Sequence, residues 1–260
     1  MKISSWNVNS VRTRINHLIN WIKEKEPDII LLQEIKCINE LFPKEEIEDL
    51  GYNVVINGQK SYNGVAILSK YKIDEVNLFL PNDPDETHSR YIEVLISINK
   101  NVVRVISVYV PNGQDIESPK FRYKLNYFDS LINHLKQLLS YDEILVVGGD
   151  FNVAPEYIDV YDPKILENKI GFHYDERKKF EAILNLGFTD SYRAINSDKQ
   201  EYSWWDYRAG AFAKNQGMRI DHILTSPEAS DLLCEATIDK YTRGLERSSD
   251  HAPINITINL

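Results

Sequence analysis

Short runs rich in Val, Ile and Tyr recur along the whole 260-residue chain and alternate irregularly with helical patterns. These runs cover residues 2–8, 28–33, 52–57, 64–69, 91–98, 102–110, 143–148, 219–225 and 253–258. Their length and composition predict β-strands. Their irregular order argues against a doubly wound parallel sheet. It favours two mixed sheets packed face to face with helices outside, which is a layered α/β sandwich.

Three segments have apolar residues at the three- and four-residue spacing of amphipathic helices. They are residues 14–25, 121–139 and 176–186. The third segment is followed by Gly187, a residue typical of helix C-termini. Among the predicted strands, 52–57 and 64–69 are joined through Asn57-Gly58, which predicts a β-hairpin.

Composition indicates one domain spanning residues 1–260, because no Pro/Gly/Ser-rich linker or long like-charge run interrupts the chain. The N-terminus has no signal-peptide pattern and no apolar run approaches the roughly 20 residues that span a bilayer. We therefore expect a soluble cytoplasmic protein that does not bind membranes. Cys37 and Cys234 have neither metal-ligand spacing nor the number of a disulfide framework, so we expect reduced thiols.

The formal net charge of −9 argues at first against a nucleic-acid partner. Net charge does not exclude a local basic face, however, and a site that gathers carboxylates around a divalent metal is acidic until the metal binds. Candidate phosphate contacts are Arg12, Arg14, Lys60, Arg90, Lys120, Arg122, Lys124, Arg208, Lys214 and Arg219. Taken singly, most of them are better explained as solvated surface charges.

Polar residues follow or precede the predicted strands at five places, where a rigid scaffold can present them to a ligand. These places are residues 6–9, 33–34, 109–113, 148–152 and 249–251. Each alone is also typical of a turn or a helix cap. Together they supply carboxylates, carboxamides, a phenol and an imidazole, which metal-assisted phosphoryl transfer requires. Such oxygen ligands suit Mg²⁺ or Mn²⁺, and no Cys/His cluster offers a zinc site.

Six motifs then appear in a fixed order along the chain. They are Asn7, Leu32-Gln33-Glu34, Tyr109-Val110-Pro111, Gly149-Asp150-Phe151-Asn152, Arg219-Ile220-Asp221-His222 and Ser249-Asp250-His251. This set resembles the exonuclease III family of abasic endonucleases, within the endonuclease/exonuclease/phosphatase superfamily, over essentially the whole chain. The resemblance implies a four-layered αββα sandwich, in which two mixed β-sheets are flanked by helices and loops at one end form the active site.

The resemblance also implies a magnesium site. By position, Glu34 is the principal ligand of Mg²⁺, and Asn7 and Asp250 complete a site that keeps several waters. We expect Mn²⁺ to substitute. Asp250 has an alternative interpretation as a loop cap. Residue 35 departs from the family pattern, since Ile35 stands where family members usually carry Thr.

Catalytic roles carry over in the same way. Asp150 is the base that draws a proton from the attacking water, and Asn152 orients that water or a phosphate oxygen. His251 contacts the scissile phosphate, and Asp221 fixes the orientation of this imidazole. Tyr109 supports the phosphate or the leaving oxygen. The division of acid and base roles among Asp150, Tyr109 and His251 stays open, and Asp221 has an alternative interpretation as a structural partner.

For substrate, the resemblance implies duplex DNA that contains abasic sites or blocked 3′ ends. Trp204 and Met218 match positions that wall a small apolar pocket for the base-free sugar, and Arg90 and Asn112 match positions that contact the backbone near the lesion. Trp205 is more simply a core residue. The implied enzyme is a monomeric DNA repair nuclease with 3′→5′ exonuclease and 3′-phosphatase activity, acting in base excision repair. Two rival classes remain, a lipid or inositol phosphatase of the same fold and a catalytically silent nucleic-acid-binding module.

Overall fold

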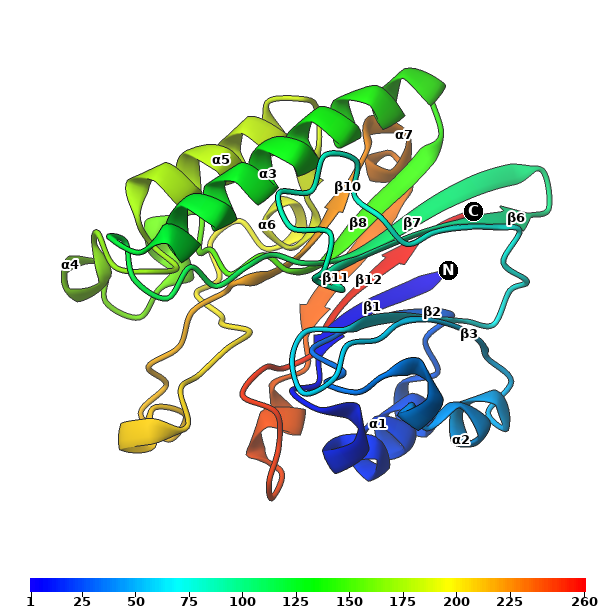
Figure 1. Ribbon diagram of the computed structural model, residues 1–260, viewed down its shortest axis with the longest axis horizontal. Coiled ribbons are helices and arrows are strands. Elements are labelled where there is room, and N and C mark those ends of the chain that lie inside the picture. Colours follow the sequence, from blue (N-terminus) through cyan, green and yellow to red (C-terminus); the bar gives the residue numbers. More distant parts are fainter.

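The computed structural model describes residues 1–260 and contains two mixed β-sheets that pack face to face between two layers of helices (Figure 1). In spatial order, the first sheet contains β11 (Leu233–Ile238), β12 (Ile254–Ile258), β1 (Lys2–Asn7), β2 (Ile29–Gln33), β4 (Val65–Ser69) and β3 (Asn53–Asn57). The second contains β5 (Glu75–Asn77), β6 (Tyr91–Ile98), β7 (Asn101–Tyr109), β8 (Ile144–Asp150), β10 (Asp221–Thr225) and β9 (Thr189–Asp190). The expected four-layered αββα sandwich is confirmed.

Both sheets are mixed, and this determines which strand ends meet. β1 pairs in parallel with β2, and β7 pairs in parallel with β8, whereas the other pairings are antiparallel. The carboxyl ends of each parallel pair therefore lie at the same edge of their sheet. β10 runs against β8, so that Asp221 at its start lies opposite Asp150 at the end of β8.

The core between the sheets explains why residues 28–33 read as a continuous apolar run. Ile29 and Leu31 of β2 face the opposite sheet and join a cluster with Val94 and Val105. Ile30 and Leu32 point the other way, into the cluster beneath α1 (Val11–Lys25). A strand that is buried on both faces has no polar side, so its sequence does not alternate.

The outer face of the second sheet is covered by α3 (Pro119–Leu138) and α5 (Tyr174–Leu184), the upper helices in Figure 1. α3 begins with a cap, because the Ser118 side chain accepts a hydrogen bond from the Lys120 amide. The short helices are α2 (Lys44–Glu48), α4 (Pro163–Leu166), α6 (Ser191–Ile195) and α7 (Pro227–Ser230). The 3₁₀ turns are η1 (Asn39–Leu41), η2 (Leu139–Tyr141), η3 (Tyr157–Asp159), η4 (Arg208–Gly210) and η5 (Lys240–Gly244).

Every run expected to form a strand does so, with ends that move by at most two residues, and the expected helices are α1, α3 and α5. The hairpin of β3 and β4 is confirmed. The sequence did not predict β5, β9 or β11, which are short or lie at a sheet edge. None of the helices combines the length and the apolar character that crossing a bilayer requires.

Candidate active site

A pocket of about 300 Å³ opens where strand ends of the two sheets meet, and we call it the site pocket. It is lined by Glu34, Tyr109, Asn112, Asp150, Asn152, Ile170, Gly171, Trp204, Met218, Ile220, Asp250 and His251. Most of the residues singled out from the sequence therefore gather here. The other three are close by: Asn7 and Asp221 lie behind the pocket wall, and Arg90 lines a neighbouring hollow with Asn112.

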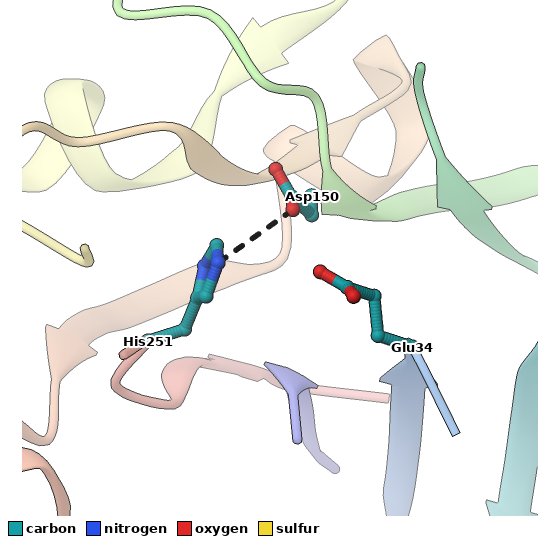
Figure 2. A group of neighbouring side chains, drawn as sticks. All are labelled: Glu34, Asp150 and His251. Atoms are coloured by element: carbon teal, nitrogen blue, oxygen red, sulfur yellow. Dashed lines mark ion pairs between the residues drawn. The ribbon is translucent and has the colours of Figure 1, made fainter. Parts of the chain in front are cut away.

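Two carboxylates and an imidazole point toward one another in this pocket (Figure 2). One ligand atom each from Glu34, Asp150 and His251 lies within 4.8 Å of the others. Nε2 of His251 is 3.8 Å from Oδ2 of Asp150, and its Nδ1 is 2.8 Å from Oδ2 of Asp221. The imidazole is thus held between two carboxylates, with Asp221 on the side away from Glu34 and Asp150.

Asn7 connects the two sheets at this point. Its buried Nδ2 donates to Oε1 of Glu34 at 2.8 Å and to Oδ2 of Asp150 at 2.9 Å. Its Oδ1 accepts from the Asn9 amide at 3.0 Å. The Asn7 carboxamide therefore holds the Glu34 and Asp150 carboxylates close together. It offsets their mutual repulsion, since their nearest oxygens lie within 4.8 Å of each other.

Asp250 also lines the site pocket and is held by two donors. Oδ1 accepts from Nδ2 of Asn9 at 2.9 Å, and Oδ2 accepts from the indole Nε1 of Trp204 at 3.0 Å. The backbone of Trp204 forms isolated antiparallel β-bridges with Met218 and with His251. The Trp204 indole packs against the apolar cluster that contains Met218 and also donates to Asp250, a candidate metal ligand.

The loop after β8 is shaped around Asp150. Oδ1 of Asp150 accepts from the Asn152 amide at 2.9 Å, and Asn152 adopts a left-handed backbone conformation with φ 53°. Asn152 donates to the carbonyl of Val110, and its Oδ1 accepts from Nδ2 of Asn112 at 3.0 Å. Left-handed non-glycine residues persist where the surroundings hold them and cluster at functional sites.

Tyr109 and Arg90 lie at the boundary between the site pocket and the neighbouring hollow, whose volume is about 410 Å³. The Arg90 guanidinium lies 4.7 Å from the centroid of the Tyr109 ring and donates to its carbonyl at 3.2 Å. Burial, followed by the charges of Glu34 and Asp150, raises the pKa of Tyr109 well above its ordinary value. The phenol therefore keeps its proton at neutral pH.

Two residues proposed as phosphate contacts are buried, so this prediction is wrong for them. Arg219 is 1% exposed and forms a bidentate ion pair with Asp159. Lys124 is fully buried and pairs with Glu176. A cation without solvent access cannot reach DNA. Of the other candidates, Arg14 is occupied by the carbonyls of Asn9, Arg247 and Ser248, whereas Arg12, Lys60, Lys120, Arg122, Arg208 and Lys214 are exposed.

Comparison with known proteins agrees with this geometry. A sequence model of the Endonuclease/Exonuclease/phosphatase family matches residues 4–251. Exodeoxyribonuclease III of Haemophilus influenzae is 33% identical over 98% of both chains. The chain belongs to the exonuclease III branch of the endonuclease/exonuclease/phosphatase family.

Solved structures support this membership. The 3′ phosphatase NExo from Neisseria, bound to a product DNA hairpin, has a TM-score of 0.96 and 40% sequence identity, with complete coverage of both chains. An AP endonuclease from Archaeoglobus fulgidus has a TM-score of 0.95 and 38% identity, also with complete coverage of both. Enzymes of this branch are therefore hydrolytic nucleases, and the chain shares their fold over its entire length.

Nucleases of this family depend on divalent metal ions, and the acidic cluster of this chain fits such an ion. Glu34 and Asp150 supply hard carboxylate oxygens, which suit Mg²⁺ better than a soft metal. The Lys36 ammonium lies 2.8 Å from Oε2 of Glu34. The ion pair with Lys36 shows that the Glu34 carboxylate can bind a positive charge at the position expected for the metal ion.

The charges at the site also favour proton transfer. Burial is the main cause that raises the pKa of Asp150 to about 7, and the carboxylates of Asp221 and Glu34 add to it, whereas His251 opposes it. Burial alone would lower the pKa of His251, but Asp221 and Asp150 outweigh burial and raise it. Near neutral pH, Asp150 can therefore accept or release a proton beside an imidazolium.

Sequence reasoning gave no individual role to three residues that shape the site, although it singled out the segments that contain Asn9 and Ser249. Asn9 contacts Asp250 and Lys36, and Ser249 accepts from the His251 amide while donating to the Asn7 carbonyl. Lys36 lies two residues after Glu34, and this short spacing was a signal that could have identified it. Ile35, where the family usually has Thr, is fully buried and belongs to the apolar cluster beneath α1.

Proposed function

We propose that this chain is a DNA repair nuclease that hydrolyses the phosphodiester 5′ to an abasic site in duplex DNA and trims blocked 3′ ends. One observation carries this proposal, namely that Glu34, Asp150 and His251 converge beside an apolar wall of Trp204 and Met218. Glu34, Asp150 and His251 supply the functional groups for hydrolysis, and Trp204 and Met218 supply an apolar surface in the same pocket. In this proposal the wall receives the base-free sugar, whose extrusion from the duplex costs least because base pairing is already absent there.

We assign the attack on phosphorus to water activated by Asp150, with Asn152 orienting that water. The raised pKa of Asp150 supports its role as a base near neutral pH. His251 donates to the scissile phosphate, and Asp221 orients the imidazole through the 2.8 Å contact. Tyr109, which keeps its proton, supports the phosphate or the leaving oxygen.

We further propose Mg²⁺ as the physiological metal, with Mn²⁺ able to substitute, held by Glu34, Asn7 and Asp250. When bound, the ion stabilises negative charge on the phosphate. Glu34 is the best supported of these ligands, because its carboxylate, unlike the side chains of Asn7 and Asp250, belongs to the cluster that could hold a metal ion. In the present arrangement, the oxygens of Asp250 face Asn9 and Trp204, and Asn7 turns its nitrogen toward Glu34.

We assign contacts with the DNA backbone to Arg90 and Asn112, which lie at the rim of the site pocket. Both line the neighbouring hollow together with Lys120 and His88. This cationic lining supports a path for the phosphates next to the lesion. We also propose that residues 1–260 act as one catalytic domain, as a monomer and in the cytoplasm, and light scattering of the purified chain tests the monomer.

A single assay tests the proposed function. The protein is incubated with duplex DNA that holds one abasic site, with Mg²⁺ or with excess chelator, and matched intact duplex and a phosphoinositide are supplied in parallel. We expect metal-dependent incision 5′ to the abasic site and no release of phosphate from the lipid. Lipid hydrolysis would favour the phosphatase of the same fold, and binding without cleavage would favour a silent nucleic-acid-binding module.

A further inference from the structure

The ion pair between Lys124 and Glu176 is fully buried, and both side chains are 0% exposed. Lys124 lies on α3, and Glu176 lies in the first turn of α5. A buried ion pair is often no more stabilising than apolar residues of the same volume, because the charges lose their hydration. Stability alone therefore does not account for this pair.

Lys124 uses its whole hydrogen-bonding capacity. An ammonium group has three protons to donate. They reach the carbonyl of Asn152 at 2.7 Å, the carbonyl of Asn112 at 3.3 Å and Oε2 of Glu176. The two carbonyls belong to the loops that follow β8 and β7, so one side chain joins both of these loops.

Glu176 extends the same network to a third loop. Its second oxygen, Oε1, accepts from the amide of Gly171 at 2.7 Å and from the amide of His173 at 3.0 Å. The loop before α5 is held to the β8 loop by one further bond, from the Ala154 amide to the Gly171 carbonyl at 2.7 Å. No polar side-chain atom of Lys124 or Glu176 is left without a partner.

Each of these three loops contributes to the site pocket. Asn112, Asn152 and Gly171 all line it, and Gly171 faces Met218 closely enough that an added Cβ would lie 3.0 Å from the methionine methyl group. The ion pair lies behind this wall, and Glu34, Trp204 and Asp250 do not contact it. Releasing the pair would therefore move the wall formed by Asn112, Asn152 and Gly171, and it would act on the acidic cluster only through the Asn152 amide, from which Asp150 accepts a hydrogen bond.

We propose that Lys124 and Glu176 are positioning residues that hold three loops together and thereby set the shape of the site pocket and its selectivity for the abasic sugar. The selectivity part rests on the proposed function. The loop-holding part does not depend on it. A shift of about 1 Å in groups that position a substrate is enough to change rates strongly.

The test neutralises the pair with the double variant K124M/E176Q, in which the Gln carbonyl can still accept from the amides of Gly171 and His173. The control, R104M/E93Q, neutralises a largely buried pair between β7 and β6, in the sheet that α3 and α5 cover. Arg104 also pairs with Glu143, which precedes β8, whereas Asp150 ends that strand, so the control lies at the far end of the sheet. Amide hydrogen exchange of residues 110–114, 150–154 and 168–174 is measured beside kcat/KM for abasic and intact duplex.

We expect faster exchange in these three segments of K124M/E176Q but not of R104M/E93Q, and a loss of preference for abasic over intact duplex of at least about tenfold. Unchanged exchange in a folded K124M/E176Q would overturn the loop-holding role. Faster exchange with an unchanged preference would overturn the selectivity role. If the double variant does not fold, E176Q alone is measured with the same readouts and expectations. A wild-type protein that shows no abasic preference would reject the proposed function, and the exchange data would still decide the loop-holding role.

Discussion

The indole nitrogen of Trp204 donates a hydrogen bond of 3.0 Å to Oδ2 of Asp250. The same ring contributes to the apolar wall beside Met218. In the proposed function, Trp204 therefore serves substrate selection through its ring and metal binding through its hydrogen bond to Asp250. A substitution that keeps an aromatic ring at this position but removes the indole N–H can separate these two roles.

Trp204→Phe should keep most of the preference for abasic over intact duplex, because an aromatic ring still fills the wall. It should raise the Mg²⁺ concentration needed for half-maximal activity, because Asp250 loses a donor that fixes its orientation. Trp204→Ala should lose both properties. Metal titrations of kcat/KM on both substrates measure these effects, with thermal melting as the control for folding. A Phe variant that responds to Mg²⁺ like the wild type would show that the hydrogen bond is irrelevant to the metal.

Activity should depend strictly on a divalent cation. Chelation should abolish cleavage and Mg²⁺ or Mn²⁺ should restore it, because the ion stabilises transition-state charge by several kcal/mol. Glu34→Gln should weaken metal binding, which calorimetry with Mg²⁺ alone can follow independently of turnover. Glu156→Gln, an exposed carboxylate outside the site pocket, is the control. Full turnover in excess chelator would exclude metal-dependent chemistry.

Asp150→Asn should lower kcat by about 10²–10⁴-fold if the carboxylate is the general base. The change keeps the size of the side chain and its ability to accept from the Asn152 amide, so folding and DNA affinity should remain close to the wild type. Single-turnover cleavage and equilibrium DNA binding measure the two effects separately. Nearly unchanged turnover in a folded variant would remove Asp150 from the mechanism.

The pH profile should report the same carboxylate. The pKa of Asp150 is raised to about 7, mainly by burial. A base acts only when deprotonated, so kcat/KM should fall with unit slope as the pH drops below this pKa. A cation bound beside Glu34 favours the charged carboxylate, so the break should move to lower pH as the metal concentration rises. The acid limb should disappear in Asp150→Asn, and an unchanged limb in that variant would assign it to another group.

DNA binding should weaken with added salt despite the net charge of −9, because backbone contacts release counterions from the duplex. Lys120→Ala should reduce the slope of log affinity against log salt by about 1, because this exposed lysine lines the hollow beside Arg90. Lys72→Ala changes an exposed lysine that follows β4 at the other end of its sheet and should leave the slope unchanged. Equal slopes in the wild type and Lys120→Ala would exclude a phosphate contact by Lys120.

Much of the fold could be predicted because the central strands are apolar enough to be recognised without knowing their partners. Residues 28–33 are an example, since burial on both faces removed every polar residue from the middle of the run. β11 could not be predicted in this way. Its exposed edge position admits Cys234 and Glu235, so that its sequence resembles that of a loop.

Some residues of the candidate site could also be predicted from the sequence, whereas others could not. Asp150 and Glu34 could be singled out because each follows an apolar strand. Lys124 could not be recognised as buried, because its burial depends on Glu176 and on two carbonyls from distant loops. A charged residue is expected to be exposed unless a partner for its charge is known. The sequence alone did not identify Glu176 as the partner of Lys124, because the two residues are far apart in the chain.

The position of β1 in the first sheet has a consequence for synthesis of the protein. β1 is made before the other strands of both sheets, yet it lies between β2 and β12, and β12 is the last of these strands along the chain. One edge of β1 therefore stays open on the ribosome until residue 258 has emerged, and Asp250 and His251 also arrive late. The site lacks Asp250 and His251 until this part of the chain has emerged, so we expect nuclease activity only after β12 can pair with β1.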